Sequence, residues 1–459
     1  MPSIMQVIFN SSLEFSLIGV AVFSLIASLF QTTTLSRSIK NLFLTILTLL
    51  IITVFTFHLY YHTNIIDVLL LFSCLCIIYL HTYYHSSKIT NFSVYFLVIS
   101  AFIGTLFAIR SKDFLSLYLA FEIIAFVGYI VVALLQKKIL TSESAMKYFI
   151  IGGISSAIML FGISFIYGGS NSIEFYDIKH NTLVTIGIIM FLCGIFFKLT
   201  AFPFHFWAPD VYSTTSLPSL SIITILPKVA ALLALSNIIP YIQENIILTT
   251  ITMVAIASMI IGSVGGIFQN HIQKILAYSG IANIGFILTA FITPVFTKTV
   301  LIEFITIYSI SVLFFITVLM SIRKNFTYNG TISSIQGLYK TNPYLAFLLS
   351  LSLLNLAGIP PLSGFFAKYI IIKNLMLQAN FYIPIIIVTT SAIGLFYYLK
   401  IIKNIYFNTP QQNIELSYHS FKTSLLMKVY IIAMFLFVLL YFVFQTSTTY
   451  QHLIQSFIG

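Results

Sequence analysis

The sequence predicts an all-α, polytopic membrane protein of about fourteen transmembrane helices, and three observations support this fold class. Of the 459 residues, 59% are apolar and only 7% are charged, whereas a soluble domain carries about 25% charged residues. The mean hydropathy is +1.03. Apolar runs of about 20 residues, the length that crosses a bilayer as a helix, recur along the whole chain. No stretch is polar enough to form a soluble domain, so we expect residues 1–459 to form a single membrane domain.

The predicted spans are apolar runs separated by polar breaks. They lie near 10–30, 40–60, 65–85, 92–110, 112–136, 144–168, 182–209, 217–240, 246–268, 273–293, 299–322, 343–378, 382–405 and 425–446. We expect them to be organised as N-terminal helices (1–91), a first repeat (92–240), a second repeat (246–405) and a C-terminal helix with its tail (425–459).

Two of these runs are long and interrupted by proline. The first reads FKLTAFPFHFWAPD around Pro203 and Pro209, and the second reads LNLAGIPPLSGFFAKY around Pro360 and Pro361. Proline removes a backbone donor and frees a carbonyl, and at membrane depth such groups must line a wet cavity or face protein. Pro203 and Pro360 are 157 residues apart, an offset that covers five helices, so we expect two inverted five-helix repeats, each with a broken helix. Paired broken helices indicate a transport site, although a simple proline kink explains either break alone.

The distribution of basic residues predicts the orientation. Thirteen lysines and arginines fall in predicted loops opposite the termini, and five fall in loops on the terminal side. Because loops on the cytoplasmic or matrix side are enriched in Lys and Arg, we expect both termini to lie outside, in a periplasm or intermembrane space. The net charge of +11 is then mostly a topology signal, and we expect a lipid bilayer and no nucleic acid as partner.

Charged residues also lie inside the predicted spans: Glu122, Lys147, Lys198, Lys228 and Lys368. Each charge at the centre of a membrane helix costs about 2.5 to 3.5 kcal/mol on insertion scales, so this set indicates a function. Lys147 lies near a helix end and has two structural alternatives, snorkelling to the headgroups or an i,i+4 pair with Glu143. For Glu122 the alternative is a fixed structural partnership with a lysine of a neighbouring helix.

Buried lysines suit a proton relay. Removal from water disfavours the ammonium and a nearby carboxylate favours it, so a lysine held between these influences can gain and lose a proton. A row of such lysines can pass charge sideways through the membrane with little backbone motion. No nucleotide-binding loop, dinucleotide fingerprint or CxxC pair appears, and Cys74, Cys76 and Cys193 lie within apolar runs as small buried hydrophobes. We therefore expect neither a redox centre nor a metal site in this chain.

Several segments resemble one known family. FKLTAFPFHFWAPDVY followed by LPKVA, and the earlier SAMKYFIIGGISSAIMLFGISFIYG, are similar to the antiporter-like subunit N of NADH:quinone oxidoreductase (respiratory complex I) and to its mitochondrial counterpart, chain two. QKILAYSGIANIGFIL, LAGIPPLSGFFAKY and SAIGLFYYLKI fit the same family. The resemblance covers roughly residues 100–405, and the segment 197–212 is highly specific.

The resemblance implies a role for each intramembrane charge. Glu122 on the fifth helix would pair with Lys147 on the sixth, and Lys198 would be the central lysine before the break of the seventh helix. Lys228 would be the lysine of the eighth helix, and Lys368, on the broken twelfth helix, would lie toward the exit.

One position departs from the family pattern. Relatives usually read AYSSIAHxG, whereas this chain reads AYSGIANIG, with Asn283 where a histidine is expected. Asparagine does not titrate, which removes a proton carrier from that position. The basic pair of the family is also reduced here to Lys274 followed by Ile275.

The function implied by the resemblance is proton translocation driven by quinone reduction elsewhere in complex I. The NADH, FMN, iron–sulfur and quinone sites would then belong to the other membrane and peripheral subunits of the complex. Two rival functions share the fold: a subunit of a multi-subunit cation/proton antiporter, and a structural subunit that has lost pumping. Abundant Ile, Phe, Tyr and Asn with a single Trp suggest an AT-rich genome, such as that of a mitochondrion or of a reduced intracellular bacterium. We expect the mitochondrial inner membrane, with the bacterial plasma membrane as the alternative.

Overall fold

The computed structural model describes residues 20, 73–80, 92–134, 139–179, 181–242, 244–292, 298–325, 328–378, 381–408 and 425–446. The predicted spans near 10–30 and 40–60 therefore lie almost entirely outside the described residues. Of the span near 65–85, only residues 73–80 are described, and they are helical.

The other predicted spans are confirmed as helices. The unbroken ones are α4 (Phe92–Arg110), α5 (Phe114–Leu134), α6 (Ile139–Ser170), α9 (Leu217–Ile238), α10 (Asn245–Ile267), α11 (Ile272–Leu288), α12 (Lys298–Asn325), α16 (Tyr382–Tyr406) and α17 (Leu425–Thr446). The two predicted to be broken each form two helices, α7 (Thr182–Leu199) with α8 (Trp207–Thr214), and α14 (Pro343–Ala357) with α15 (Ser363–Leu377). Short helical segments connect them: η1 (Phe175–Asp177), η2 (Ile239–Tyr241), η3 (Thr289–Ile292), η4 (Ile332–Ile335) and α13 (Leu338–Thr341).

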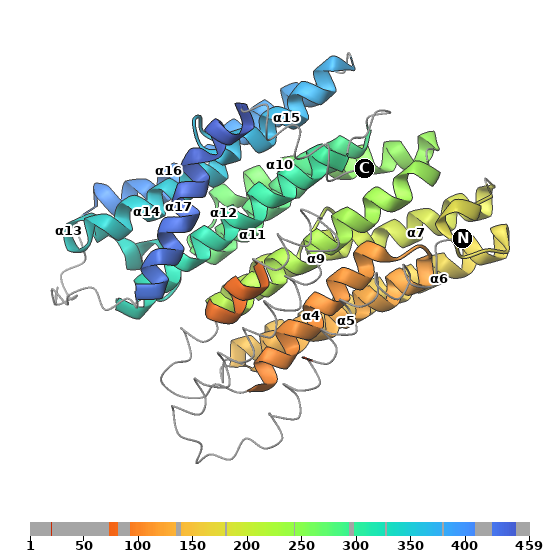
Figure 1. Cartoon of the computed structure of the whole chain (residues 1–459), viewed down its shortest axis with the longest axis horizontal. Coiled ribbons are helices and arrows are strands. Elements are labelled where there is room, and N and C mark those ends of the chain that lie inside the picture. The colour runs from red at the N-terminus through yellow and green to blue at the C-terminus, as the bar shows by residue number, and fades with distance from the viewer. Residues whose placement is uncertain are drawn as a thin grey trace.

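The long helices run roughly side by side, with α4–α7 toward one end of the molecule and α13–α17 toward the other (Figure 1). Between them lie α9, α11 and α12, whose most apolar stretches are 94%, 89% and 94% buried inside the protein. In contrast, the corresponding stretches of α6, α10 and α16 are only 39%, 39% and 33% buried. The polar residues of α9, α11 and α12 are therefore mostly surrounded by other helices of the protein and not exposed to lipid.

Glycines allow the closest helix contacts, as is common in membrane bundles. Gly162 of α6 faces Gly187 of α7, and a Cβ added to either would lie 2.6–2.7 Å from the carbonyl oxygen of the other. Gly262 of α10 and Gly285 of α11 approach the partner helix backbone in the same way. These contacts fix α7 against α6 and α11 against α10.

Both predicted breaks are confirmed, and both begin at a residue in the left-handed region. Thr200 (φ 61°) ends α7, and Gly358 (φ 81°) ends α14. The peptide bonds Phe202–Pro203 and Pro360–Pro361 are cis. At the first break the Phe202 amide donates to the hydroxyl of Ser258 on α10 at 2.9 Å, so a neighbouring helix satisfies a backbone group that the interrupted helix leaves free.

Candidate functional site

Lys198 occupies the last turn of α7, and its charge faces the carboxylate of Glu122 on α5. The lysine Nζ lies 3.8 Å from Glu122 Oε1, and the exposed fractions of the two side chains are 4% and 20%. Ser156 of α6 donates a hydrogen bond to the same oxygen at 2.5 Å. Three helices therefore meet at one carboxylate, which partly neutralises the almost fully buried ammonium of Lys198.

The predicted pairing of Glu122 with Lys147 is wrong. Glu122 pairs with Lys198, whereas Lys147 pairs with Glu143 at 2.8 Å and its side chain is 47% exposed. Glu122 contacts α6 at Ser156, and nine residues along a helix separate that position from Lys147 by about 13 Å. The i,i+4 pair between Glu143 and Lys147, considered above as an alternative, is confirmed.

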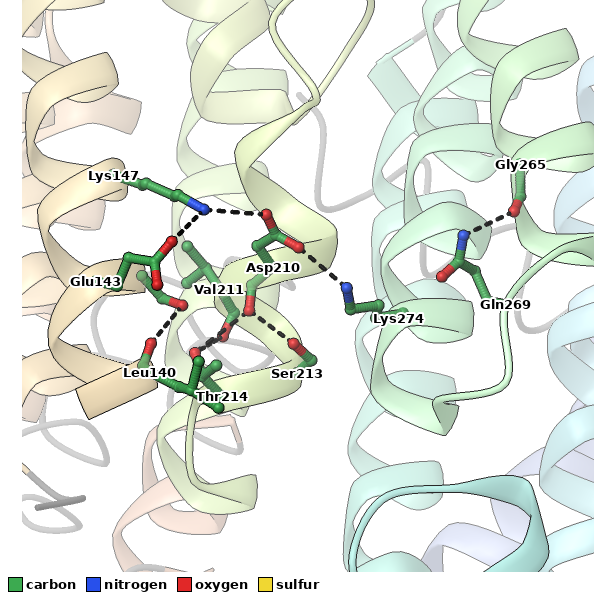
Figure 2. A network of polar contacts seen from close by, with 11 residues as sticks. Leu140, Glu143, Lys147, Asp210, Val211, Ser213, Thr214, Gly265, Gln269 and Lys274 are labelled. Carbon is green, nitrogen blue, oxygen red and sulfur yellow. Dashed lines mark hydrogen bonds and ion pairs between the residues drawn. The ribbon is translucent and has the colours of Figure 1, made fainter. Parts of the chain in front are cut away.

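Lys147 belongs to a second, half-exposed cluster that is centred on Asp210 of α8 and that we call the Asp210 cluster. Figure 2 shows Lys147 from α6 and Lys274 from α11 approaching this carboxylate from opposite sides, at Nζ–O distances of 3.7 and 3.0 Å. The Trp207 ring of α8 stacks on Tyr148 of α6 with centroids 4.3 Å apart. The Asp210 cluster thus ties the segment after the first break to helices of both predicted repeats.

Lys228 lies at the centre of the molecule on α9 and is 1% exposed. Its Nζ donates to the hydroxyl of Tyr308 on α12 at 2.9 Å and lies 5.3 Å from the centroid of that ring. Lys228 is about 16 Å from the start of α9, and Tyr308 about 15 Å from the start of α12, which places both near mid-span. Among the described residues, the Tyr308 hydroxyl is the group that accepts a hydrogen bond from the Lys228 ammonium.

Lys368 is held differently, on α15 just after the second break. Its Nζ donates to the carbonyl of Ala357 at the end of α14 at 2.8 Å and lies 4.7 Å from the centroid of the Phe286 ring. The break has freed this carbonyl from helical hydrogen bonding, so it is available to the lysine. Lys368 therefore lies among neutral dipoles and an aromatic face.

Asn355 of α14 fixes the geometry of the second break. Its side-chain oxygen accepts from the Gly364 amide at 2.8 Å and from the Ser363 hydroxyl at 3.1 Å, and its amide nitrogen donates to Ser311 of α12 at 2.7 Å. A Cβ at Gly364 would lie 1.9 Å from the Asn355 carbonyl oxygen, so only glycine fits this approach. The start of α15, and with it Lys368, is set by these contacts.

Two cavities adjoin Lys368. The first, of about 20 Å³, is also lined by Tyr308, Asn283 and Ser311. The second, of about 10 Å³, is also lined by Asn283 and by Tyr398, whose hydroxyl is hydrogen-bonded to Ser279. The first cavity has room for one water molecule and the second is at the lower limit for one. Lys368 and Asn283 thus belong to both cavities.

The family profile described as NADH:quinone oxidoreductase/Mrp antiporter, TM, matches residues 111–394. An NADH-quinone oxidoreductase subunit N from Rickettsia bellii (strain RML369-C) is 36% identical over 344 residues, which cover 72% of this chain and 75% of that protein. The chain belongs to the NADH-quinone oxidoreductase subunit N family. The resemblance seen in the sequence is thereby confirmed, and the five predicted site residues all fall inside the segment that the family profile matches.

Solved structures share the fold. A chain of respiratory complex I from Thermus thermophilus with bound aureothin superposes with a TM-score of 0.76 at 20% identity, covering 93% of this chain and 97% of that one. A chain of the Mrp complex from Dietzia sp. DQ12-45-1b gives a TM-score of 0.76 at 19% identity, covering 89% of this chain and 81% of that one. The predicted antiporter-like membrane fold is therefore confirmed.

Sequence reasoning missed three residues of this site. Ser156, Tyr308 and Asn355 carry no charge and are common residue types in membrane helices, so neither cost nor composition marks them. Glu303, a second acid in a predicted span, lies in the first two turns of α12 (Lys298–Asn325), and the set of intramembrane charges given above leaves it out. The insertion-cost argument that singled out Glu122 would have found it.

Proposed function

We propose that this chain is a proton-translocating membrane subunit of an NADH:quinone oxidoreductase, in which buried lysines and a glutamate carry the protons. The observation that carries the proposal is the placement of Lys198, Lys228 and Lys368. Their ammonium groups come from α7, α9 and α15, and each is held by a different kind of polar partner: a carboxylate, a phenol hydroxyl and a backbone carbonyl. Such groups are costly unless they are used.

In this proposal the proton enters the row of lysines at Lys198, where the carboxylate of Glu122 stabilises it. A proton that reaches Lys198 is stabilised by the carboxylate 3.8 Å away, with an attraction on the order of 4 kcal/mol at an effective dielectric constant of 20, before desolvation is subtracted. Passing the proton to Lys228 and then to Lys368 moves the charge toward the second break. Lys147 keeps a role at the exposed edge, where the Asp210 cluster collects protons from the aqueous side.

The partners and cofactors follow from the family. We propose that the chain assembles with the other membrane and peripheral subunits of complex I, and that the NADH, FMN, iron–sulfur and quinone sites lie in those subunits. For the membrane, the Rickettsia bellii relative supports the bacterial plasma membrane, whereas the amino-acid bias of an AT-rich genome fits a mitochondrion and a reduced intracellular bacterium alike. Fractionation of the native source, with detection of this chain in isolated organelles, decides between them.

The rival function is a subunit of a multi-subunit cation/proton antiporter. The description of the matching family names Mrp antiporters beside NADH:quinone oxidoreductases, and the fold is shared with the Mrp complex. The 36% identity to a subunit N over 344 residues favours the oxidoreductase. Co-purification of this chain with NADH-dependent quinone reductase activity would support the proposal, and its recovery only in an assembly without that activity would favour the antiporter.

The decisive experiment replaces Lys198 by methionine in the assembled complex. Lys198→Met keeps the length of the side chain and removes the group that titrates, so the complex should assemble. Proton uptake into reconstituted vesicles and NADH:quinone turnover should both fall at least tenfold, because proton-transferring groups typically contribute a factor of about 10²–10⁴. Lys373→Met, which removes an exposed lysine of α15, is the matched control and should retain wild-type rates. Wild-type pumping by an assembled Lys198→Met complex would show that Lys198 is structural.

A further inference from the structure

Tyr308 of α12 contacts the ammonium of Lys228 and also lines a cavity that Lys368 borders. Tyr308 accepts the hydrogen bond of the Lys228 ammonium at 2.9 Å, and it lines the first cavity together with Lys368. Lys228 is not among the residues that line that cavity. The tyrosine therefore separates the lysine of α9 from the cavity that the lysine of α15 borders.

The surroundings leave space for this contact and hold it in place. Phe304, one turn earlier on α12, stacks on the Tyr308 ring with the planes only 10° apart. On α11, a Cβ at Gly280 would lie 2.8 Å from Lys228 Nζ and 3.3 Å from the Tyr308 hydroxyl. Any larger residue at Gly280 would crowd both polar groups.

The other polar side chains of the first cavity cannot take the place of this hydroxyl. The Asn355 side chain donates to the Ser311 hydroxyl and accepts from the Gly364 amide at the start of α15. Asn355 and Ser311 are therefore both engaged in holding the second break. Asn283 can hydrogen-bond to water, but an amide does not exchange a proton as an acid or a base. Tyr212 of α8 and Tyr398 of α16 are the further titratable groups that interact electrostatically with Tyr308.

We propose that the Tyr308 hydroxyl relays the proton from Lys228 to the cavity of Lys368. The Lys228 ammonium gives one proton to a lone pair of the phenol oxygen while the phenol O–H gives its own proton to a water in the cavity, and that water protonates the neutral amine of Lys368. Lys228 ends as an amine, Lys368 as an ammonium, and Tyr308 is neutral before and after. Rotation of the hydroxyl then restores the starting hydrogen bond. This inference rests on the proposed lysine relay.

The test compares Tyr308→Phe with Lys228→Met in the assembled complex, reconstituted in vesicles. Tyr308→Phe keeps the ring and its stacking on Phe304, so the complex should assemble, and proton uptake and NADH:quinone turnover should fall on the order of 10- to 100-fold. Tyr328→Phe is the control, because Tyr328 is also buried and its hydroxyl has no hydrogen-bond partner within the described residues. It should retain wild-type rates.

A second variant separates a proton carrier from a side chain that only positions Lys228. A fluorinated tyrosine at position 308 keeps the size and the hydrogen bond but makes the hydroxyl a stronger acid. If Tyr308 carries protons, pumping should return and the pH profile of turnover should shift relative to wild type. Restored pumping with an unchanged pH profile would overturn the relay step. Normal pumping by Tyr308→Phe with loss in Lys228→Met would also overturn it while leaving the proposed function intact, whereas normal pumping by both variants would refute the lysine relay itself.

Discussion

The two broken helices hold their lysines in opposite ways. At the first break Lys198 precedes the interruption and faces the carboxylate of Glu122 at 3.8 Å. At the second break Lys368 follows the interruption and donates to the Ala357 carbonyl at 2.8 Å. Within the described part of the chain, no carboxylate forms an ion pair with Lys368. One lysine is stabilised by an opposite charge, and the other by a backbone dipole and an aromatic ring.

The two lysines therefore depend on different interactions. A charged partner stabilises an ammonium strongly, but its removal leaves a buried charge uncompensated. A freed carbonyl holds an ammonium through the position of the backbone, so the second site depends on how α14 and α15 meet. Removing a carboxylate should therefore affect the first break, and moving the backbone should affect the second.

The largest expected effect is that of Glu122→Gln. The change removes the carboxylate that stabilises protonated Lys198, an attraction on the order of 4 kcal/mol at an effective dielectric constant of 20, so NADH:quinone turnover and proton uptake by the assembled complex should fall at least about tenfold. Because Glu122 acts through Lys198, the double variant with Lys198→Met should be no worse than Lys198→Met alone.

Glu143→Gln is the matched control for the first prediction, since Glu143 is 55% exposed and pairs with the half-exposed Lys147. Exposed ion pairs contribute only about 0 to 1 kcal/mol, so this variant should stay near wild-type turnover. Equal losses in Glu122→Gln and Glu143→Gln would mean that burial of the first pair has no special importance.

A smaller effect, confined to the second break, is expected for Gly364→Ala. The added Cβ would lie 1.9 Å from the Asn355 carbonyl oxygen, so the backbone that positions Lys368 must move. We expect a lower thermal unfolding midpoint for the complex and reduced proton uptake. At Gly153→Ala, where a Cβ meets nothing within 4 Å, helix propensity should stabilise α6 by about 0.8 to 1.0 kcal/mol. A Gly364→Ala complex as stable and active as Gly153→Ala would show that the close approach does not set the site.

The smallest effect is expected for Lys147→Met. Its partners Glu143 and Asp210 are 55% and 45% exposed, and Lys274 still contacts Asp210 after the change. Turnover should fall by no more than about fivefold, the equivalent of the roughly 1 kcal/mol upper value for an exposed pair. A loss of turnover as large as that of Lys198→Met would move Lys147 into the essential row and remove the distinction between buried and exposed lysines.

The features that could be predicted from the sequence are those that depend only on consecutive residues within one segment. The spans from 92–110 to 425–446 were predictable because crossing a bilayer requires about 20 apolar residues in a row, which is a one-dimensional property. The breaks were predictable because proline cannot donate the helical hydrogen bond wherever it stands. The division into inverted repeats and the outward orientation of the termini stay predictions.

The site was only partly predictable, for a physical reason that the two lysines of α6 and α7 illustrate. Both Lys147 and Lys198 stand out by the cost of a charge in an apolar run. Which of them meets Glu122 depends on the depth and rotation of α5, α6 and α7, and those are set by packing at positions such as Gly162 and Gly187. The family resemblance identified the residue set and assigned the wrong pair.

By itself the sequence determined that this protein is a bundle of membrane helices with charges buried in it, because hydropathy and the cost of an intramembrane charge are properties of each segment alone. Only the tertiary structure decided which groups share those charges: Ser156 on the Glu122 carboxylate, Tyr308 on the Lys228 ammonium and the Ala357 carbonyl on Lys368. A hydrogen bond requires two groups within about 3 Å, and in these contacts the partners are 34, 80 and 11 residues apart along the chain. Such distances are fixed by how helices pack, and no single segment encodes them.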